Sequence, residues 1–279
     1  MQVKRMKIDL VKISPTENMT ILVKTPIEEK EQLYVGTELM KYGSVYAEQV
    51  GFIEAPINAQ AVSRLRMMAG EFCGNATMAL AAYKAFEQGR SAGEKVDVVL
   101  EVSGVKDVLV CRIEVLEKGR DAGTVSMPLP LAIEDKHYII GGEEMFLTTI
   151  IFEGIKHIIL PKGDIGNNFQ HILETSIAGI NNQINEDVYG IIVFDEDTLR
   201  IDPLVSVQSA GSFCWERGCG SGSEAVGIYL ACKYKKSIRC DIKQPGGVIT
   251  VDVEYTDQIE KASITGNVEI VLEGTAYIG

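Results

Sequence analysis

The sequence predicts an α/β protein with two pseudo-symmetric halves, each a β-rich sheet or barrel wrapped on a central helix. Two observations support this fold class. Short runs rich in β-branched residues alternate with a few helical segments in each half of the 279-residue chain. In addition, one local design occurs once in each half: a cysteine, a glycine, small polar residues and then a helix.

The first half is expected to hold strands and two helices. The strand-like runs are NMTILV (18–23), QVGFIEA (49–55), VDVVLEVSG (96–104) and DVLVCRIEVL (107–116), and the helices cover residues 27–42 and 76–87. The second of these helices carries a broad apolar stripe. We therefore expect it to lie inside a cup of strands.

The second half repeats this plan. Its strand-like runs are MFLTTIIFEG (145–154), IKHIILP (155–161), YGIIVFDE (189–196) and GGVITVDVEY (246–255), and its helices cover residues 167–180 and 222–235. The later helix is apolar nearly all round, which is typical of a helix buried on most sides.

The boundary between the halves is expected at SMPLPLA (126–132), where two prolines interrupt the strand pattern. The first half then comprises residues 1–126, and the final segment 267–279 forms one more strand that completes it. Residues 127–266 form the second half.

Composition argues against several classes of protein. The net charge is −12 and no cluster of five Lys/Arg residues is present, whereas a nucleic-acid partner requires a basic face. No apolar run approaches the roughly 18 residues that span a bilayer, and the start lacks the apolar core of a signal peptide. We therefore expect a cytoplasmic protein with neither a nucleic-acid nor a membrane partner.

The cysteines and histidines do not resemble a metal site or a disulfide framework. The six cysteines lack paired C-x2-C spacings, and the three histidines are scattered. A cytosolic chain of this length is also an unusual setting for structural disulfides. We expect no metal.

The repeated design has a chemical meaning. Cys73 precedes Gly-Asn-Ala-Thr and Cys219 precedes Gly-Ser-Gly-Ser, and each run opens a predicted helix. Glycine lets a ligand approach the backbone, and the unpaired N–H groups of a helix N-terminus bind carboxylates. A helix N-terminus also lowers the pKa of a cysteine below its usual value of about 8.5. Each turn therefore combines an anion cradle with a potential base.

If the two turns face one bound carboxylate, a thiolate removes the α-proton and the opposite thiol returns one to the other face. This sequence of steps inverts a stereocentre without a cofactor, as a racemase or epimerase requires. The alternative is that a cysteine is simply a small buried hydrophobe. We apply that interpretation to the other four, which are Cys111, Cys214, Cys232 and Cys240.

The stretches NMTILV, EQVGFIE, EFCGNATM, CGSG, QPGG and AYI together resemble the diaminopimelate epimerase family of two-cysteine amino acid racemases, and the resemblance covers the whole chain. More closely, the chain is similar to the histidine racemases of staphylopine-type metallophore pathways. The resemblance implies the diaminopimelate epimerase-like fold, an active site between the halves, no cofactor, an amino acid substrate and a homodimer.

The resemblance also implies roles for individual residues. Cys73 and Cys219 match the catalytic pair, and Glu216 matches a glutamate that receives the α-amino group. The other implied substrate-binding residues are Gly74, Asn75, Gly220 and Ser221, whose backbone cradles the α-carboxylate, together with Asn18 and Gln49. The plain structural alternatives are a turn cap for Asn18 and a solvated surface carboxylate for Glu216.

Departures from the epimerase pattern bear on the substrate. Ile155 stands where the epimerases hold the distal end of diaminopimelate with an asparagine, and YGIIVF offers only apolar residues at the next such position. Leaving a second zwitterion unpaired costs roughly 1–3 kcal/mol per buried group. These substitutions favour a smaller or partly apolar side chain such as imidazole.

Two charged residues keep alternatives open. Arg217, in WERG, resembles the epimerase ERG; it could hold an acidic distal group, lower the thiol pKa of Cys219 or pair with a surface carboxylate. Glu48 could contact a cationic or imidazole side chain, line the entrance or be an exposed strand-end charge. The competing functions are a diaminopimelate epimerase, a racemase of another amino acid, a non-amino-acid isomerase and an amino acid-binding regulatory module.

Overall fold

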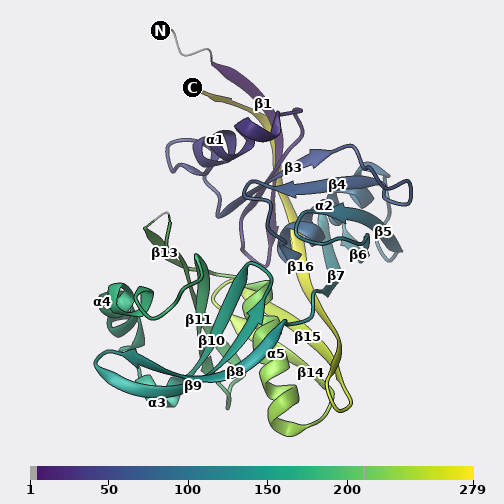
Figure 1. The fold of residues 1–279 in the computed structure, drawn as a ribbon. Coiled ribbons are helices and arrows are strands. Elements are labelled where there is room, and N and C mark those ends of the chain that lie inside the picture. Colours follow the sequence, from purple (N-terminus) through teal and green to yellow (C-terminus); the bar gives the residue numbers. More distant parts are fainter. Residues whose placement is uncertain (1–4, 210) are drawn as a thin grey trace. The chain divides into compact units, whose positions relative to one another are not determined.

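The computed structural model describes residues 5–209 and 211–279, and the chain divides into two compact units. Unit 1 comprises Met1–Ser126 and Ile264–Gly279, and unit 2 comprises Met127–Ser263. Figure 1 shows the helices and strands of both units.

In unit 1 a sheet closes on itself. Along the sheet the strands follow the order β1 (Met6–Pro15), β2 (Thr20–Val23), β3 (Gln49–Glu54), β4 (Ser63–Met67), β5 (Lys95–Val102), β6 (Leu109–Glu117), β7 (Arg120–Met127) and β16 (Ile259–Ile278). The last strand also pairs antiparallel with the first, with Met6 opposite Ile278. The first and last strands of the chain therefore lie side by side (Figure 1).

Helix α2 (Gly74–Glu87) is the central helix of unit 1. It contacts β1, β2, β5 and β6, and every residue from 74 to 83 is buried. Helix α1 (Glu29–Met40) instead covers β3 with one face, since its buried residues recur at helical spacing. The predicted helix inside a cup of strands is confirmed.

Unit 2 has the same kind of plan. Its strands follow the order β8 (Ala132–Ile140), β9 (Glu143–Phe152), β10 (Ile155–Pro161), β11 (Val188–Asp195), β12 (Arg200–Val207), β14 (Ile238–Gln244) and β15 (Gly247–Tyr255), and β13 (Ser212–Trp215) pairs with β12. Strands β10 and β11 are parallel, and α3 (Lys162–Ile165) and α4 (Phe169–Asn181) lie in the connection between them.

Helix α5 (Gly220–Tyr234) is the central helix of unit 2. It contacts β9, β10 and β11 and also β14 and β15, which lie further along the same sheet. A methyl group at Gly227 would lie 2.5 Å from Val251 Cγ1, so the helix approaches β15 too closely for a larger side chain. The predicted burial of this helix on most sides is confirmed.

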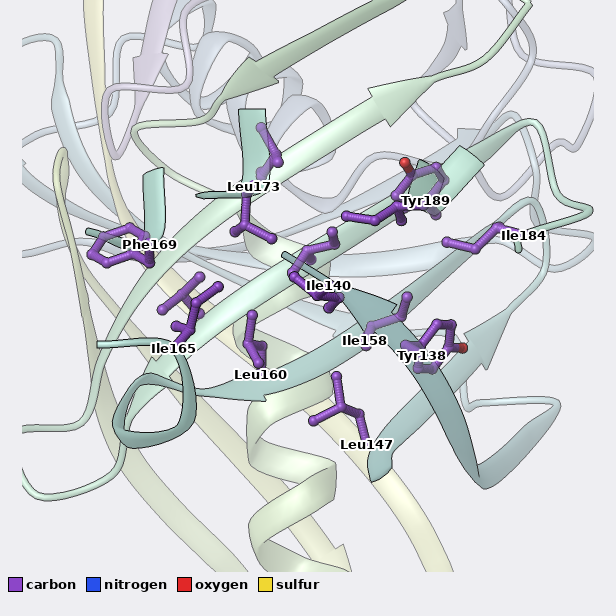
Figure 2. Close-up of a cluster of buried hydrophobic side chains, with 14 residues drawn as sticks. Tyr138, Ile140, Leu147, Ile158, Leu160, Ile165, Phe169, Leu173, Ile184 and Tyr189 are labelled. Atoms are coloured by element: carbon purple, nitrogen blue, oxygen red, sulfur yellow. The ribbon is translucent and has the colours of Figure 1, made fainter. Parts of the chain in front are cut away.

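A second set of side chains fills the space between α4 and the strands of unit 2. Figure 2 shows this cluster, which contains Phe169 and Leu173 of α4 together with Ile158 and Leu160 of β10. His157 and Ile159 are also buried, although they point to the opposite face of the same strand. Strand β10 is therefore covered on both faces, which explains its nearly continuous apolar sequence.

The strands and helices expected from the sequence are all present, and their bounds differ from the predicted ones by only a few residues, except that the final strand begins at Ile259 and not at residue 267. In the described residues, no helix combines the length and the apolar character needed to cross a bilayer.

Candidate active site

The two cysteine turns have the same local geometry. Cys73 is the N-cap of α2 with φ −138° and ψ 112°, and Cys219 is the N-cap of α5 with φ −112° and ψ 107°. Each sulfur accepts a hydrogen bond from the backbone N–H three residues later, at 3.4 Å from Ala76 N and at 3.3 Å from Gly222 N. A thiol thus takes the place that a Ser, Thr, Asp or Asn side chain usually takes at the start of a helix.

The hydroxyl residue four positions after each cysteine completes the turn. Thr77 Oγ1 donates to the Cys73 carbonyl at 2.8 Å, and Ser223 Oγ donates to the Cys219 carbonyl at 2.7 Å. Both hydroxyl residues are fully buried. These bonds hold the backbone of each cysteine at the end of its helix, which explains why both motifs carry a hydroxyl residue at that position.

Unit 1 gathers most of the predicted site residues around Cys73. Its Sγ donates to Gln49 Oε1 at 3.0 Å, and Gln49 Nε2 donates to Asn18 Oδ1 at 2.5 Å. Asn75 Nδ2 donates to the same Asn18 oxygen at 3.1 Å, and Asn18 Nδ2 donates to Glu48 Oε2 at 2.5 Å. Asn18 is 3% exposed, so it is a buried link between strands and not only a turn cap.

Unit 2 gathers a second set around Cys219. The Cys219 backbone N–H donates to Gln244 Oε1 at 2.6 Å, and Gln244 Nε2 donates to Ser223 Oγ at 2.8 Å. The sulfur lies 3.8 Å from Ser221 Oγ and is hydrogen-bonded to the Glu216 side chain. Gln244 is the first residue of the QPGG stretch, so that stretch holds the start of α5 in place.

The predicted lowering of the Cys219 pKa is wrong for this state of the protein. Burial raises the pKa of this thiol well above its usual value, and the negative charge of Glu216 and its hydrogen bond raise it further. The Gly222 N–H and the Ser221 hydroxyl lower the pKa but do not compensate. The helix N-terminus is therefore outweighed, because the sulfur is only slightly exposed and faces a carboxylate.

The segment that leads to Cys219 is anchored on both sides. Trp215 Nε1 donates to Glu174 Oε1 of α4 at 2.9 Å. Arg217 Nη2 donates to the Pro245 carbonyl at 3.3 Å, and the Arg217 carbonyl accepts from Gly246 N at 2.7 Å. Arg217 thus joins the WERG segment to the turn between β14 and β15.

His157 is a residue of this region that sequence reasoning missed. Its Nε2 lies 2.9 Å from Ser221 Oγ, and burial lowers its pKa to about 3, so the ring is neutral. In the described part of the chain its buried Nδ1 has no hydrogen-bond partner. Gly190, opposite His157 in the neighbouring strand, makes room for the ring, since a Cβ there would lie 2.4 Å from Nδ1.

A signal for His157 was present in the sequence. A histidine inside the apolar run IKHIILP, followed by a strand that contains a glycine, indicates a buried ring packed against a bare backbone. From the sequence alone, the three histidines were candidates only for a metal site. Within residues 5–209 and 211–279, no three His, Cys, Asp or Glu side chains are grouped to hold a metal ion.

A cavity in unit 2 is not lined by the Cys219 turn. It has a volume of about 490 Å³ and lies beyond the ends of the parallel strands β10 and β11. Its lining includes Lys162, Asp195, Asp197 and Tyr229, but no residue of either cysteine turn.

Comparison with known proteins identifies the family. A family model described as the histidine racemase CntK N-terminal domain matches residues 7–277. The chain belongs to the histidine racemase family. A histidine racemase of Fusobacterium nucleatum subsp. nucleatum is 35% identical over 277 residues, which cover 98% of this chain and 97% of that relative. A histidine racemase of Staphylococcus aureus is 30% identical over 279 residues, which cover 98% of this chain and 99% of the relative.

Solved structures show that the histidine racemase family shares its fold with more distant proteins. A hydroxyproline epimerase from Agrobacterium vitis matches with a TM-score of 0.70, covering 99% of this chain and 94% of that one, at 11% identity. A probable proline racemase from Agrobacterium radiobacter matches with a TM-score of 0.71, covering 98% and 93%, at 12% identity. The predicted fold class is confirmed, and at these identities the likeness concerns the fold alone.

Proposed function

We propose that this member of the histidine racemase family is a cofactor-independent amino acid racemase that inverts the α-carbon of histidine, with Cys73 and Cys219 as its two acid–base groups. One observation carries the proposal: each unit places one cysteine at the N-cap of its central helix, with the same N–H···S contact. A two-base racemase requires two equivalent groups that exchange roles when the reaction runs backwards.

The proposed reaction has two proton transfers. A thiolate takes the α-proton, and the electron pair of the broken C–H bond passes into the substrate carboxylate. The opposite thiol then donates its proton to the other face of the α-carbon. The N-termini of α2 and α5, which start at Gly74 and Gly220, stabilise the carboxylate as charge develops on it.

Glu216 gives Cys219 a means of activation by substrate. Its carboxylate raises the pKa of the thiol in the free protein through charge and a hydrogen bond. If the substrate ammonium pairs with Glu216, that charge is neutralised and the carboxylate no longer raises the thiol pKa. Binding of an amino acid therefore favours the Cys219 thiolate, whereas a ligand without an amino group does not.

The apolar character of unit 2 supports histidine over diaminopimelate. Ile155 begins β10, and residues 190–194 of β11 are buried and apolar. Neither strand offers there the amide side chains that would hold a second amino acid group. An imidazole ring requires fewer hydrogen bonds than a zwitterion and suits such surroundings.

The proposal is tested by incubating pure L-histidine with the protein in deuterated water. We expect deuterium at the α-carbon by NMR and a decay of optical rotation to zero. Serine replacements of Cys73 and of Cys219 should each abolish racemisation, and Cys240→Ser, in β14, is the matched control that should retain it. Exchange with diaminopimelate but not with histidine would reassign the substrate, and no exchange with any amino acid would end the proposal.

A homodimer and a role in metallophore biosynthesis, which the sequence resemblance implies, and the cytoplasmic location expected from the composition complete the proposal. Light scattering should give twice the mass of one chain. For the competing non-amino-acid isomerase, Glu216 would be dispensable, so retention of full activity by Glu216→Gln would favour that alternative.

A further inference from the structure

We propose that Glu48, Asn18 and Gln49 form a one-directional hydrogen-bond chain that holds Cys73 as a thiol in the free protein. These three are positioning residues for the sulfur. The inference rests on the proposed function for its meaning, because it decides which cysteine enters the reaction as the acid. Its test, however, reads the thiol itself and does not require turnover.

The direction of the chain is set at Glu48. An ionised carboxylate only accepts hydrogen bonds, so the side chain of Asn18 must offer its Nδ2 to Glu48 Oε2, at 2.5 Å. The Oδ1 of Asn18 is thereby turned to the other side, towards Gln49. The assignment of the two atoms of this amide follows from its partner and is not arbitrary.

The second link fixes the amide of Gln49. Asn18 Oδ1 is an acceptor, so Gln49 must offer its Nε2, at 2.5 Å. The same Nε2 donates to Thr20 Oγ1 at 2.8 Å, and the Thr20 proton is already engaged by the Asn18 carbonyl at 3.0 Å. Two separate acceptors therefore demand the same orientation of Gln49.

The third link reaches the sulfur. With its nitrogen engaged, Gln49 presents Oε1 to Cys73 Sγ at 3.0 Å. An amide oxygen accepts from an S–H group but repels a thiolate at this distance. Turning the amide around would place Gln49 Oε1 against Asn18 Oδ1, so the chain resists this rotation. The long contact from Ala76 N, at 3.4 Å, is the opposing interaction that favours a thiolate.

Charge near Cys73 acts in the same direction as the chain. Glu48 lies at the far end of the chain, and Glu71 lies two residues before the cysteine. A carboxylate close to a thiol disfavours a negative charge on its sulfur. A test must therefore separate the orientation of the amide from the presence of carboxylates.

The two cysteines consequently differ although their turns are alike. The thiol of Cys73 faces a neutral amide oxygen, which a substrate ammonium cannot neutralise. The thiol of Cys219 faces Glu216, a carboxylate that an ammonium can neutralise. For the enantiomer whose α-proton faces Cys219, the base is thus Cys219 and Cys73 supplies the proton, whereas the opposite enantiomer requires the reverse roles.

The experiment measures alkylation of each cysteine by iodoacetamide from pH 6 to pH 10, read by peptide mass spectrometry. Only the thiolate reacts: an S–C bond forms and iodide leaves. In Asn18→Ala the charge of Glu48 remains but the chain is cut. Thr20 Oγ1 still accepts from Gln49 Nε2, but its hydroxyl can rotate to donate instead, so Gln49 can turn its N–H towards the sulfur. We expect the midpoint of Cys73 labelling to fall by about one pH unit, or about tenfold faster labelling at pH 7.5.

A second variant and a charge control accompany it. Glu48→Gln should lower the midpoint less than Asn18→Ala, because Asn75 Nδ2 still donates to Asn18 Oδ1 at 3.1 Å and partly holds the orientation of that amide. Glu54→Gln is the matched control. Glu54 ends β3, the strand that Gln49 begins, and it accepts from Gln32 at 2.8 Å and lies 3.5 Å from Arg64, outside the chain. We expect no shift for this control, and an equal shift would assign the effect to charge and overturn the proposal.

The pH at the midpoint of labelling distinguishes a changed orientation of the Gln49 amide from easier access of iodoacetamide to the Cys73 sulfur. A cavity left by Asn18→Ala would speed labelling equally at every pH and leave the midpoint in place, whereas release of the amide moves it. An unchanged or raised midpoint in Asn18→Ala and Glu48→Gln would overturn the hydrogen-bond chain. α-Proton exchange, measured separately in wild type, tests the proposed function, so either idea can fail alone.

Discussion

Replacing His157 with glutamine should reduce the loss of unfolding free energy that the protein shows as the pH falls. His157 is fully buried and burial lowers its pKa to about 3, from an ordinary value of 6.5. Below pH 6.5 the unfolded chain binds a proton here that the folded chain does not. The contribution of the neutral His157 ring to the stability of the fold is therefore complete above pH 6.5, and it is lost as the pH falls towards 3.

The magnitude follows from the difference between the two pKa values. Each pH unit in this window costs about 1.4 kcal/mol of unfolding free energy. At pH 5.0, which is about 1.5 units below the unfolded pKa, the loss from this one ring is about 2 kcal/mol. Glutamine does not titrate and still offers a donor to Ser221, so His157→Gln should not show this loss.

The assay is urea unfolding of both proteins at pH 7.5 and pH 5.0. Both proteins contain the same carboxylates, so the effect of these groups on stability cancels when the loss in wild type is compared with the loss in the variant. Wild type should lose about 2 kcal/mol more than the variant between these pH values. His171→Gln, on the exposed side of α4, is the matched control and should behave as wild type. Equal losses in wild type and His157→Gln would refute the reasoning that the ring is buried and neutral.

Three further predictions concern buried groups of unit 2. Gly190→Ala places a Cβ 2.4 Å from His157 Nδ1, and we expect a loss of about 1–3 kcal/mol in urea unfolding. Gln244→Leu leaves the Cys219 backbone N–H without its acceptor; we expect about 1–3 kcal/mol lower stability and slower α-proton exchange. Burial raises the pKa of Glu224 well above its ordinary value, so the folded chain keeps a proton there that the unfolded chain loses as the pH rises. Wild type should therefore lose stability between pH 5 and pH 8, and Glu224→Gln should not. A difference in denaturant midpoint between the two proteins that is the same at both pH values would count against this.

The sequence predicted best where one strand or helix carries its own signal. Runs of β-branched residues located β2, β3, β5, β6 and the apolar strands of unit 2. Strand β12 was missed, because Pro203 interrupts it and a proline argues against a strand. Strands β1, β7, β8 and β14 were also missed, because charged residues interrupt their apolar residues and they contain no continuous β-branched run. Strands β4 and β13 were missed because they are only five and four residues long.

At the site, the local motifs were visible and their surroundings were not. The two cysteine turns could be recognised because each fits within a few consecutive residues. Thr20, His157 and Gln244 reach the same regions from strands far away in the sequence, and no single-sequence pattern links them to the cysteines. The expectation for the Cys219 pKa failed for the same reason, because burial depends on tertiary packing that a local rule omits.

The pairing of β1 with β16 sets an order of events during synthesis. The closing strand of unit 1, residues 264–278, leaves the ribosome after the whole of unit 2. Before β16 is synthesised, β1 and β7 each have one edge without a strand to pair with. The sheet of unit 1 is then open, and the backbone N–H and C=O groups at these two edges have no hydrogen-bond partners in it. We therefore expect unit 2 to reach its native state on the ribosome first, and a stalled chain that ends before β16 to expose Cys73 to proteases and alkylating reagents.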